Sequence, residues 1–237
     1  MGSTYNTDSR VSDQLIVHLD ATNTKSYPGS GTVWKDLSGN NYDFTLSSSG
    51  VYNSTGVTHM AFQGSNEMAS HSSGDIPISQ TNGVTYVVAT RPKSGGQGYK
   101  TLTRGTATDH HVLIRNGIDI GSWTHNDGNF LDSGINQSDL PSHANNDWIL
   151  MYFRWANGQG FRFSYNDTPS VIRGTVTNTA AQYNSGGFAT LGNYQNGGQP
   201  WGDISLFAVW ETELTDAQLT SMYMAYKTRF SLPGSGL

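Results

Sequence analysis

The sequence predicts an all-β fold, an antiparallel sandwich of two sheets with one short C-terminal helix. Charged residues make up only 13% of the 237 residues, while Gly, Ser, Thr and Asn are abundant, which is typical of many short strands joined by turns. The apolar segments are short, rich in β-branched residues and without a helical period. A single segment near the C-terminus has the spacing of an amphipathic helix.

Composition and charge exclude several classes of protein. The net charge is −5, and Lys and Arg are scattered singly, so we expect no nucleic acid partner. The chain has no cysteine, which excludes disulfides and thiolate metal sites. No apolar run reaches the roughly 18 residues that a spanning helix needs, so we expect no membrane insertion.

We expect one main domain, at residues 12–232. No linker or internal repeat divides this range, and its length suits one large β-sandwich. Residues 1–11 are polar and aperiodic and are expected to form an N-terminal arm without a secretion signal. Residues 233–237 are expected to form a short tail.

Two hairpins are the clearest strand predictions. Residues 111–115 and 118–123 flank Asn116-Gly117. Residues 148–155 lead to Asn157-Gly158, and residues 161–165 alternate on its far side. The segment 204–210 has apolar residues at both even and odd positions, so both faces of a strand there would be apolar. This predicts a strand that is covered on both faces. The other expected strands are at 15–19, 44–46, 59–64, 84–90, 148–155, 161–165 and 189–192.

The helix is predicted at residues 215–227. Thr215 and Gln218 have the spacing of a capping box. An apolar stripe follows at three- and four-residue spacing, and we expect it to pack against the sandwich. The stripe consists of Leu214, Leu219, Met222, Tyr223 and Tyr226.

Two motifs near the ends of the predicted domain resemble those of a known family. The opening motif is Leu19-Asp20-Ala21 with Trp34-Lys35-Asp36-Leu37-Ser38-Gly39-Asn40, and the closing motif is Gly202-Asp203-Ile204 with Leu214-Thr215-Asp216-Ala217-Gln218-Leu219. Phe62-Gln63-Gly64-Ser65 and a strand beginning at Trp148 lie between them in the expected order. Together they resemble the laminin-G-like, concanavalin-A-like lectin and glucanase domains found in bacteriophage structural proteins and bacterial surface proteins.

The resemblance implies an antiparallel two-sheet jelly-roll sandwich. This fold hosts lectins, hydrolases, adhesive modules and virion parts, so it does not by itself define a function. Relatives often carry a carboxylate two residues after the isoleucine of the closing motif. This chain has Leu206 at that position.

The acidic residues and histidines favour a protein that is not an enzyme. Glycoside hydrolysis needs two carboxylates, and the only glutamates are Glu67, Glu211 and Glu213. The last two have suitable spacing but lie in the turn before the helix, and Glu67 has no acidic neighbour. His110 and His111 point to opposite faces of one strand, so they do not form a zinc site. We therefore expect no catalytic residue.

A structural calcium ion is the one cofactor that the motifs suggest. Calcium prefers carboxylate, amide and carbonyl oxygens, and the resemblance implies a site at a rim of the sandwich. The predicted ligands lie in the two motifs and are Asp20, Asp36, Asn40 and Asp203. The alternative is that Asp36 and Asp203 accept hydrogen bonds from turn N–H groups.

Carbohydrate binding needs an exposed aromatic ring beside amides or carboxylates, and two loops offer this combination. The predicted sugar-binding residues are Trp123, Asn126 and Asp127 in one loop and Tyr194, Asn196 and Trp201 in the other. The alternative is that a tryptophan in a sandwich belongs to the core. We expect that position for Trp34, Trp148 and Trp210.

These observations favour a non-enzymatic surface-display or adhesion protein. The expected location is a virion surface, as a phage decoration or fibre component. The expected partners are other virion or surface-protein subunits, and a cell-surface polysaccharide. The alternative is a secreted or bacterial cell-surface carbohydrate-binding module of a larger polysaccharide-active protein. A hydrolase or lyase with a divergent site is the third hypothesis.

Overall fold

The structure is a computed structural model that describes ten segments of the chain. They are residues 14–78, 83–95, 98–105, 110–123, 130–142, 146–155, 162–166, 174–175, 187–194 and 198–233. The predicted N-terminal arm and the Asn157-Gly158 turn lie outside these residues. No helix in the described segments is long and apolar enough to cross a membrane.

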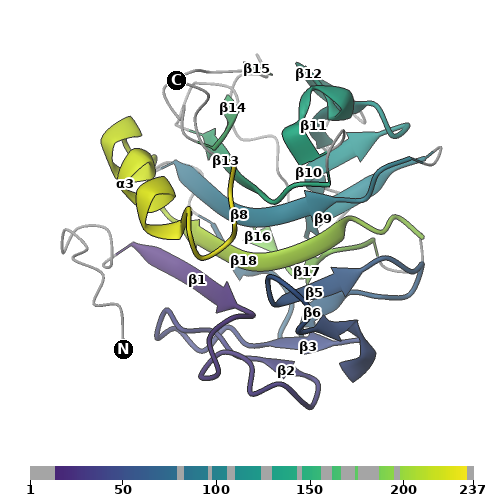
Figure 1. Ribbon diagram of the computed structural model, residues 1–237, viewed down its shortest axis with the longest axis vertical. Coiled ribbons are helices and arrows are strands. Elements are labelled where there is room, and N and C mark those ends of the chain that lie inside the picture. Colours follow the sequence, from purple (N-terminus) through teal and green to yellow (C-terminus); the bar gives the residue numbers. More distant parts are fainter. Residues whose placement is uncertain are drawn as a thin grey trace.

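Most of the described strands belong to two antiparallel sheets (Figure 1). Sheet A has the order β15-β14-β13-β8-β18-β5-β4, and β1 also pairs with β18. Its strands are β1 (Leu15–Asp20), β4 (Tyr52–Asn53), β5 (His59–Phe62), β8 (Val84–Pro92), β13 (Ile149–Trp155), β14 (Arg162–Tyr165), β15 (Gly174–Thr175) and β18 (Gly202–Trp210).

Sheet B has the order β12-β11-β10-β9-β17-β6-β3-β2. Its strands are β2 (Val33–Trp34), β3 (Phe44–Leu46), β6 (Ala69–His71), β9 (Lys100–Arg104), β10 (His110–Arg115), β11 (Asp119–Trp123), β12 (Phe130–Asn136) and β17 (Thr190–Leu191). A separate pair joins β7 (Ile76–Pro77) to β16 (Gly187–Phe188), and two 3₁₀ turns lie at η1 (Ser49–Val51) and η2 (Gln137–Asp139). The predicted all-β sandwich is confirmed.

The predicted hairpin partners also pair in the structure. Strand β10 pairs with β11, and Asn116 and Gly117 between them have φ of 54° and 68°, as a primed turn requires. Strand β13 pairs with β14 from Met151 to Arg154. Arg115 pairs with Asp119, so three residues separate the innermost paired positions of the first hairpin, one more than a two-residue loop would leave.

Strand β18 lies at the centre of sheet A. It pairs with β8 along one edge, while β5 and β1 share the other edge in succession. All nine residues of β18 are buried. This confirms the prediction that the strand is covered on both faces.

A β-bulge at Ser205 sets which side chains of β18 face each core. The register with β8 shifts between Ile204 and Leu206, because a bulge inserts one extra residue into one strand. Ile204 therefore joins Phe207 and Val209 in the core between the sheets. Simple alternation would have placed Ile204 on the opposite face, with Leu206.

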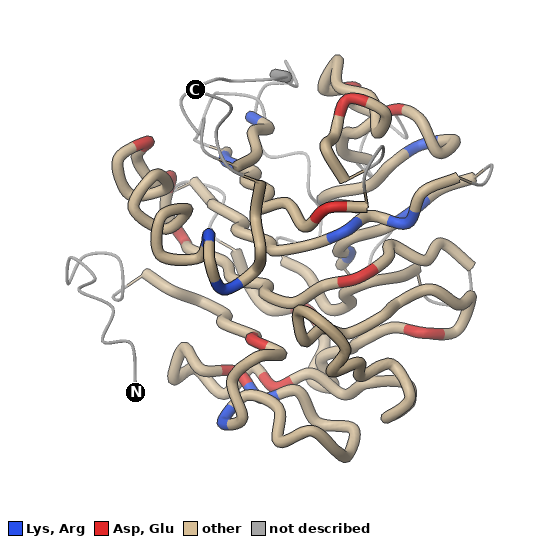
Figure 2. Tube along the Cα trace, in the orientation of Figure 1, with Lys and Arg blue, Asp and Glu red and all other residues tan. Residues whose placement is uncertain are grey.

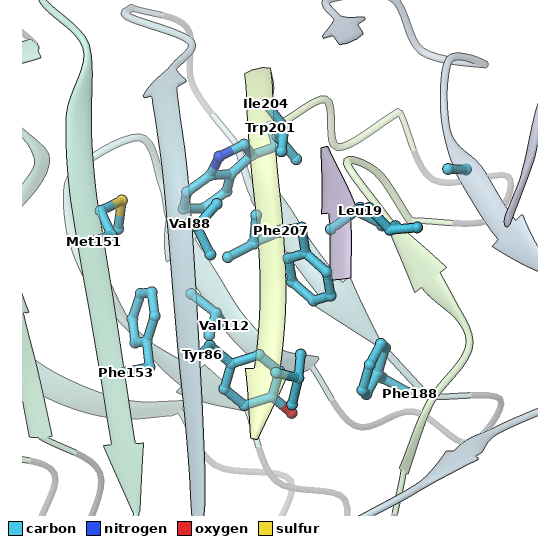
Figure 3. Packing of buried hydrophobic residues seen from close by; sticks show 14 of the residues in the cluster. Leu19, Tyr86, Val88, Val112, Met151, Phe153, Phe188, Trp201, Ile204 and Phe207 are labelled. Carbon is cyan, nitrogen blue, oxygen red and sulfur yellow. The ribbon is translucent and has the colours of Figure 1, made fainter. Parts of the chain in front are cut away.

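The core between the two sheets is rich in aromatic residues (Figure 3). Phe188 packs edge-on against Phe207, with ring centroids 5.6 Å apart, and Tyr86 lies 6.0 Å from each of them. The two edge-to-face contacts of Phe188 suit the charge distribution of aromatic rings, while the rings of Tyr86 and Phe207 are tilted by 49°. Trp34 is fully buried in the same core, as predicted.

A second core lies on the outer face of sheet A, where helix α3 (Asp216–Tyr226) covers it (Figure 1). Thr215 and Gln218 cap the helix reciprocally, which confirms the predicted capping box. Leu219, Tyr223 and Tyr226 are the buried residues of the helix. They pack in one cluster with Trp148 and Trp210, so the predicted core positions of these tryptophans are also confirmed.

Lys100 in β9 is a buried cation. The residue is 5% exposed, and its Nζ donates to Oε1 of Gln137 at 2.5 Å. Gln137 donates in turn to the backbone carbonyl of Lys93 at 2.7 Å. Burial and, to a lesser extent, the charge of Lys93 lower the pKa of Lys100 from 10.5 to about 8.

Lys100 should therefore contribute a rise in the stability of the protein between pH 8 and pH 10.5. Below this window Lys100 is charged in both the folded and the unfolded chain. Within it only the unfolded chain still binds the proton, so raising the pH favours the folded state, by at most about 1.4 kcal/mol per pH unit for one proton. Urea unfolding across this range measures the slope.

Lys100→Met should abolish this rise, while Lys35→Met, at an exposed position, should preserve it. A rise that persists unchanged in Lys100→Met would contradict the role given to this lysine.

Candidate functional site

The outer face of sheet B brings together side chains from neighbouring strands. Arg104 of β9 and Trp123 of β11 both pair with His110 of β10, so they lie on one face of the sheet, two strands apart. Phe130 of β12 pairs with Trp123 and continues the row. Ile120 points into the core, so Trp123, three residues later in the strand, points outward.

Two tyrosines extend this surface. Tyr99 is 37% exposed, and its ring packs edge-on against Trp123 with centroids 6.5 Å apart. The guanidinium carbon of Arg104 lies 4.0 Å from the ring centroid of Tyr194, a distance suited to a cation–π contact. We call Tyr99, Arg104, Trp123, Phe130 and Tyr194 the aromatic face.

Arg115 lies beside the aromatic face and is neutralised locally. Its guanidinium carbon is 4.2 Å from the ring centroid of Phe130. Its Nε and Nη2 both donate to Oδ2 of Asp119, at 3.2 and 2.8 Å. The ion pair with Asp119 and the ring contact therefore hold the guanidinium of Arg115 against Phe130, at one end of the aromatic face.

Asn193 fixes the position of Tyr194. Asn193 is fully buried, and its Nδ2 donates to the carbonyls of Gly64, Ser65 and Glu67 at 3.0 to 3.1 Å. Its Oδ1 accepts the backbone N–H groups of Tyr194 and Gln199, both at 2.7 Å. One amide thus joins the turn after β5 to the segment that carries Tyr194.

The residue before Asn193 must be glycine. Gly192 has a φ of 84°, and a Cβ there would lie 2.3 Å from the ring of Phe62. Both the backbone conformation and the close approach exclude a side chain. The backbone at Gly192 can therefore pass close to the ring of Phe62. This path places the ring of Tyr194 over Arg104.

The structure brings two of the predicted sugar-binding residues together and corrects one. Trp123 and Tyr194 come from separate loops in the sequence but lie on the same face. Trp201 is fully buried, and its Nε1 donates to Oγ1 of Thr90 at 2.8 Å, so its prediction as an exposed platform is wrong. The ring fills the core between the sheets (Figure 3). Asn126, Asp127 and Asn196 lie outside the described residues.

Sequence reasoning missed three members of the aromatic face. Tyr99, Arg104 and Phe130 were not singled out, because no local motif marks them. Only the pairing of β9, β10, β11 and β12 shows that these positions align.

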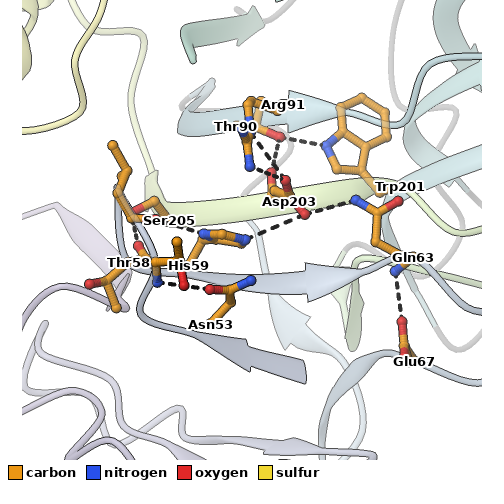
Figure 4. A network of polar contacts seen from close by, with 12 residues as sticks. Asn53, Thr58, His59, Gln63, Glu67, Thr90, Arg91, Trp201, Asp203 and Ser205 are labelled. Atoms are coloured by element: carbon orange, nitrogen blue, oxygen red, sulfur yellow. Dashed lines mark hydrogen bonds and ion pairs between the residues drawn. The ribbon is translucent and has the colours of Figure 1, made fainter. Parts of the chain in front are cut away.

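Asp203 lies in a polar network on the outer face of sheet A, away from the aromatic face (Figure 4). Arg91 donates to Oδ2 of Asp203 from Nε and Nη2, at 3.1 and 2.6 Å. Gln63 donates to Oδ1 at 2.8 Å, and Nε2 of His59 lies 3.7 Å from the same oxygen. The side chain of Asp203 thus binds other side chains, and not the turn N–H groups that the alternative to calcium predicted for it.

Asp36 accepts backbone hydrogen bonds, as the alternative to calcium predicted. Its two oxygens accept the N–H groups of His18, Ser38 and Tyr42 at 2.8 to 3.1 Å, and the hydroxyl of Ser38 at 2.6 Å. Asn40 donates to the carbonyls of Leu15 and Ile16. These hydrogen bonds hold the opening motif against β1, along the edge of this strand that does not pair with β18. The motif thereby covers a strand edge that would otherwise be open to solvent.

The predicted calcium ligands are not gathered in one place. Asp20 forms an ion pair with Arg229 and accepts the N–H and hydroxyl of Thr22, whereas Asp203 binds Arg91. No group of three or more His, Asp or Glu side chains among the described residues could hold a metal ion. The calcium prediction therefore has no ligand set within the described part of the chain.

Glu67 and Glu213 hold parts of the fold together. Glu67 accepts the backbone N–H groups of Gln63 and Gly64 through Oε2, at 2.7 and 2.6 Å. Glu213 forms an ion pair with Arg162 at 3.1 Å. The carboxylate of Glu67 thus closes a turn, and that of Glu213 links the segment before α3 to β14.

Asn193→Ala should lower the free energy of unfolding by about 2 kcal/mol or more, because it leaves buried carbonyl and N–H groups without partners. Asn193→Asp keeps the size but turns a carboxylate toward three carbonyl oxygens. It should cost at least as much at pH 7 and less near pH 4, where the carboxyl group protonates. Urea unfolding at both pH values measures this, and equal stability of the three proteins would contradict the role of Asn193.

No protein-family model and no curated protein sequence matches this chain, but solved structures match most of its length. The binding domain of Paraclostridial Mosquitocidal Protein 1 has a TM-score of 0.65 and 13% identity, covering 94% of this chain and 56% of that one. The ligand-binding domain of botulinum neurotoxin serotype D, in complex with N-acetylneuraminic acid, has a TM-score of 0.63 and 13% identity, covering 95% and 55%. Trypanosoma rangeli sialidase with 2,3-difluorosialic acid has a TM-score of 0.56 and 11% identity, covering 92% and 34%.

This chain spans about half of the two toxin domains and about a third of the sialidase. At these identities the likeness establishes the fold alone, and it agrees with the jelly-roll sandwich that the motifs imply. The laminin-G and bacteriophage parts of the resemblance stay predictions.

Proposed function

We propose that this chain is a non-catalytic glycan-binding domain whose binding surface is the aromatic face. The observation that carries the proposal is the placement of Trp123 and Tyr194. They come from distant parts of the sequence, both are partly exposed, and both lie on the outer face of sheet B. Sugar rings present apolar C–H faces, and an aromatic ring offers a large apolar surface for them to stack on.

The surroundings of the aromatic face supply polar groups that suit sugar hydroxyls. Thr190 pairs with Arg104 and Ser70 pairs with Thr190, so both hydroxyl residues continue the same row. Both are partly exposed. Binding sites for small molecules commonly combine apolar rings with a few such polar groups.

The similar structures support the proposal in a general way. Two of them are toxin binding domains, and one of these holds N-acetylneuraminic acid. The sialidase is an enzyme, but in this chain Glu67 and Glu213 are held by backbone N–H groups and by Arg162. This arrangement supports binding without catalysis.

We further propose that the domain is displayed on the outside of a particle or cell, as a phage virion decoration or fibre component. A chain without cysteine and with scattered charges (Figure 2) suits such a setting. The alternative is a module of a secreted polysaccharide-active protein. Mass spectrometry of purified particles should detect the chain as a component. Its absence from particles, together with its presence in a secreted protein, would favour the module.

Trp123→Ala and Tyr194→Ala should each weaken glycan binding by about tenfold or more, which corresponds to about 1.4 kcal/mol. The physical reason is the loss of the ring on which a sugar stacks. A glycan array with the wild-type protein identifies a ligand, and calorimetry with that ligand then measures the affinity of each variant.

Met224→Ala is the matched control. Met224 is 65% exposed on α3, on the opposite side of the sandwich, so its loss should leave binding unchanged. Trp123→Phe should restore part of the affinity, since it keeps an aromatic ring. If the wild-type protein binds no glycan, or if both alanine variants bind as well as wild type, the proposed function is wrong.

A further inference from the structure

The aromatic face is aligned across the strands. Paired residues of antiparallel strands lie directly opposite each other and on the same face. One continuous row of paired positions therefore runs perpendicular to the strands of sheet B. It passes through Val33, Thr45, Ser70, Thr190, Arg104, His110, Trp123 and Phe130.

The row is much longer than one sugar. Four strand spacings separate Thr190 from Phe130, which is roughly 19 Å at about 4.8 Å per spacing. Arg104, under Tyr194, and Trp123 are two spacings apart, or roughly 10 Å. One strand spacing is close to the advance of one unit in an extended pyranose chain. The aromatic rings of Tyr194 and Trp123 are therefore about two sugar units apart along an extended chain. One sugar ring is too short to stack on both of them.

The charges along this row favour a neutral ligand. The guanidinium of Arg104 lies beneath the ring of Tyr194, and Arg104 is only 8% exposed. Arg115, beside Phe130, is neutralised by Asp119. Asp132 of β12 is exposed and pairs with Gly121 on the same face. The whole chain carries a charge of −5, which repels a polyanion and has no effect on a neutral chain.

We propose that the aromatic face binds an extended, neutral polysaccharide that lies across the strands of sheet B. This inference rests on the proposed glycan-binding function and deepens it. The ligand occupies several positions along the row, with sugar rings on Tyr194 and Trp123. The contact between Arg115 and Phe130 forms one end of the binding surface, and the hydroxyl residues Thr190 and Ser70 continue it in the other direction.

The test is a length series measured by calorimetry. The probes are neutral gluco-, manno- and xylo-oligosaccharides, from monosaccharide to octasaccharide, together with a sialylated oligosaccharide. In the series that binds, affinity should rise with each added unit until the row is filled. The longest probe should bind at least about tenfold more tightly than the monosaccharide, since a single sugar already stacks on one ring and the second ring contributes about tenfold.

The outcomes separate this inference from the proposed function. A monosaccharide that binds as tightly as the longest chain would overturn the extended ligand and leave glycan binding standing. The same holds if only the sialylated probe binds. If neither the series, the sialylated probe nor a wider glycan array binds, the proposed function itself fails.

Variants locate the ligand along the row. Phe130→Ala, at the end, should weaken binding of the longest oligosaccharides severalfold and leave the shortest bound probe unaffected. Trp123→Ala, nearer the centre, should weaken both. Phe130→Leu keeps an apolar side chain against Gly121 and serves as the second variant if Phe130→Ala unfolds. An equal loss for short and long probes in the Phe130 variants would contradict the row.

Discussion

The fold depends on burying β18 on both of its faces. Its nine residues are all buried, and strand pairing satisfies its backbone along both edges. A strand with two apolar faces must have a layer on each side. Sheet B supplies one layer, and helix α3 supplies the other. The bulge at Ser205 adjusts which side chains reach each layer.

This three-layer arrangement makes the two outer surfaces of the sandwich different. The outer face of sheet A is covered by α3 at one end and carries the network of Asp203, Arg91 and Trp148 at the other. The outer face of sheet B carries the aromatic face, with Tyr99 and Trp123 partly open to solvent. The helix that stabilises the central strand thus occupies one surface, and the opposite surface carries the aromatic face.

The residues of the two motifs mainly fasten the fold. Asp36 and Asn40 clip the opening motif to the edge of β1, and Asp203 joins β18 to Arg91 of β8. Leu206, two residues after the isoleucine of the closing motif, is fully buried in the core beneath α3. Motifs of this kind identify the sandwich because they close its edges and corners. The candidate binding residues lie outside them, so the resemblance indicates the fold far better than the ligand.

The sequence by itself determined the features that depend on local chemistry. The capping box of Thr215 and Gln218, the turn at Asn116-Gly117 and the double burial of 204–210 follow from the preferences of neighbouring residues. Tertiary structure alone decided the rest. Trp201 and Trp123 are equally aromatic and equally close to turns, yet one fills the core and the other faces outward. The aromatic face exists only because the register of four strands aligns residues that are far apart in the sequence. Such alignment is set by long-range pairing, which leaves no signal in a local segment.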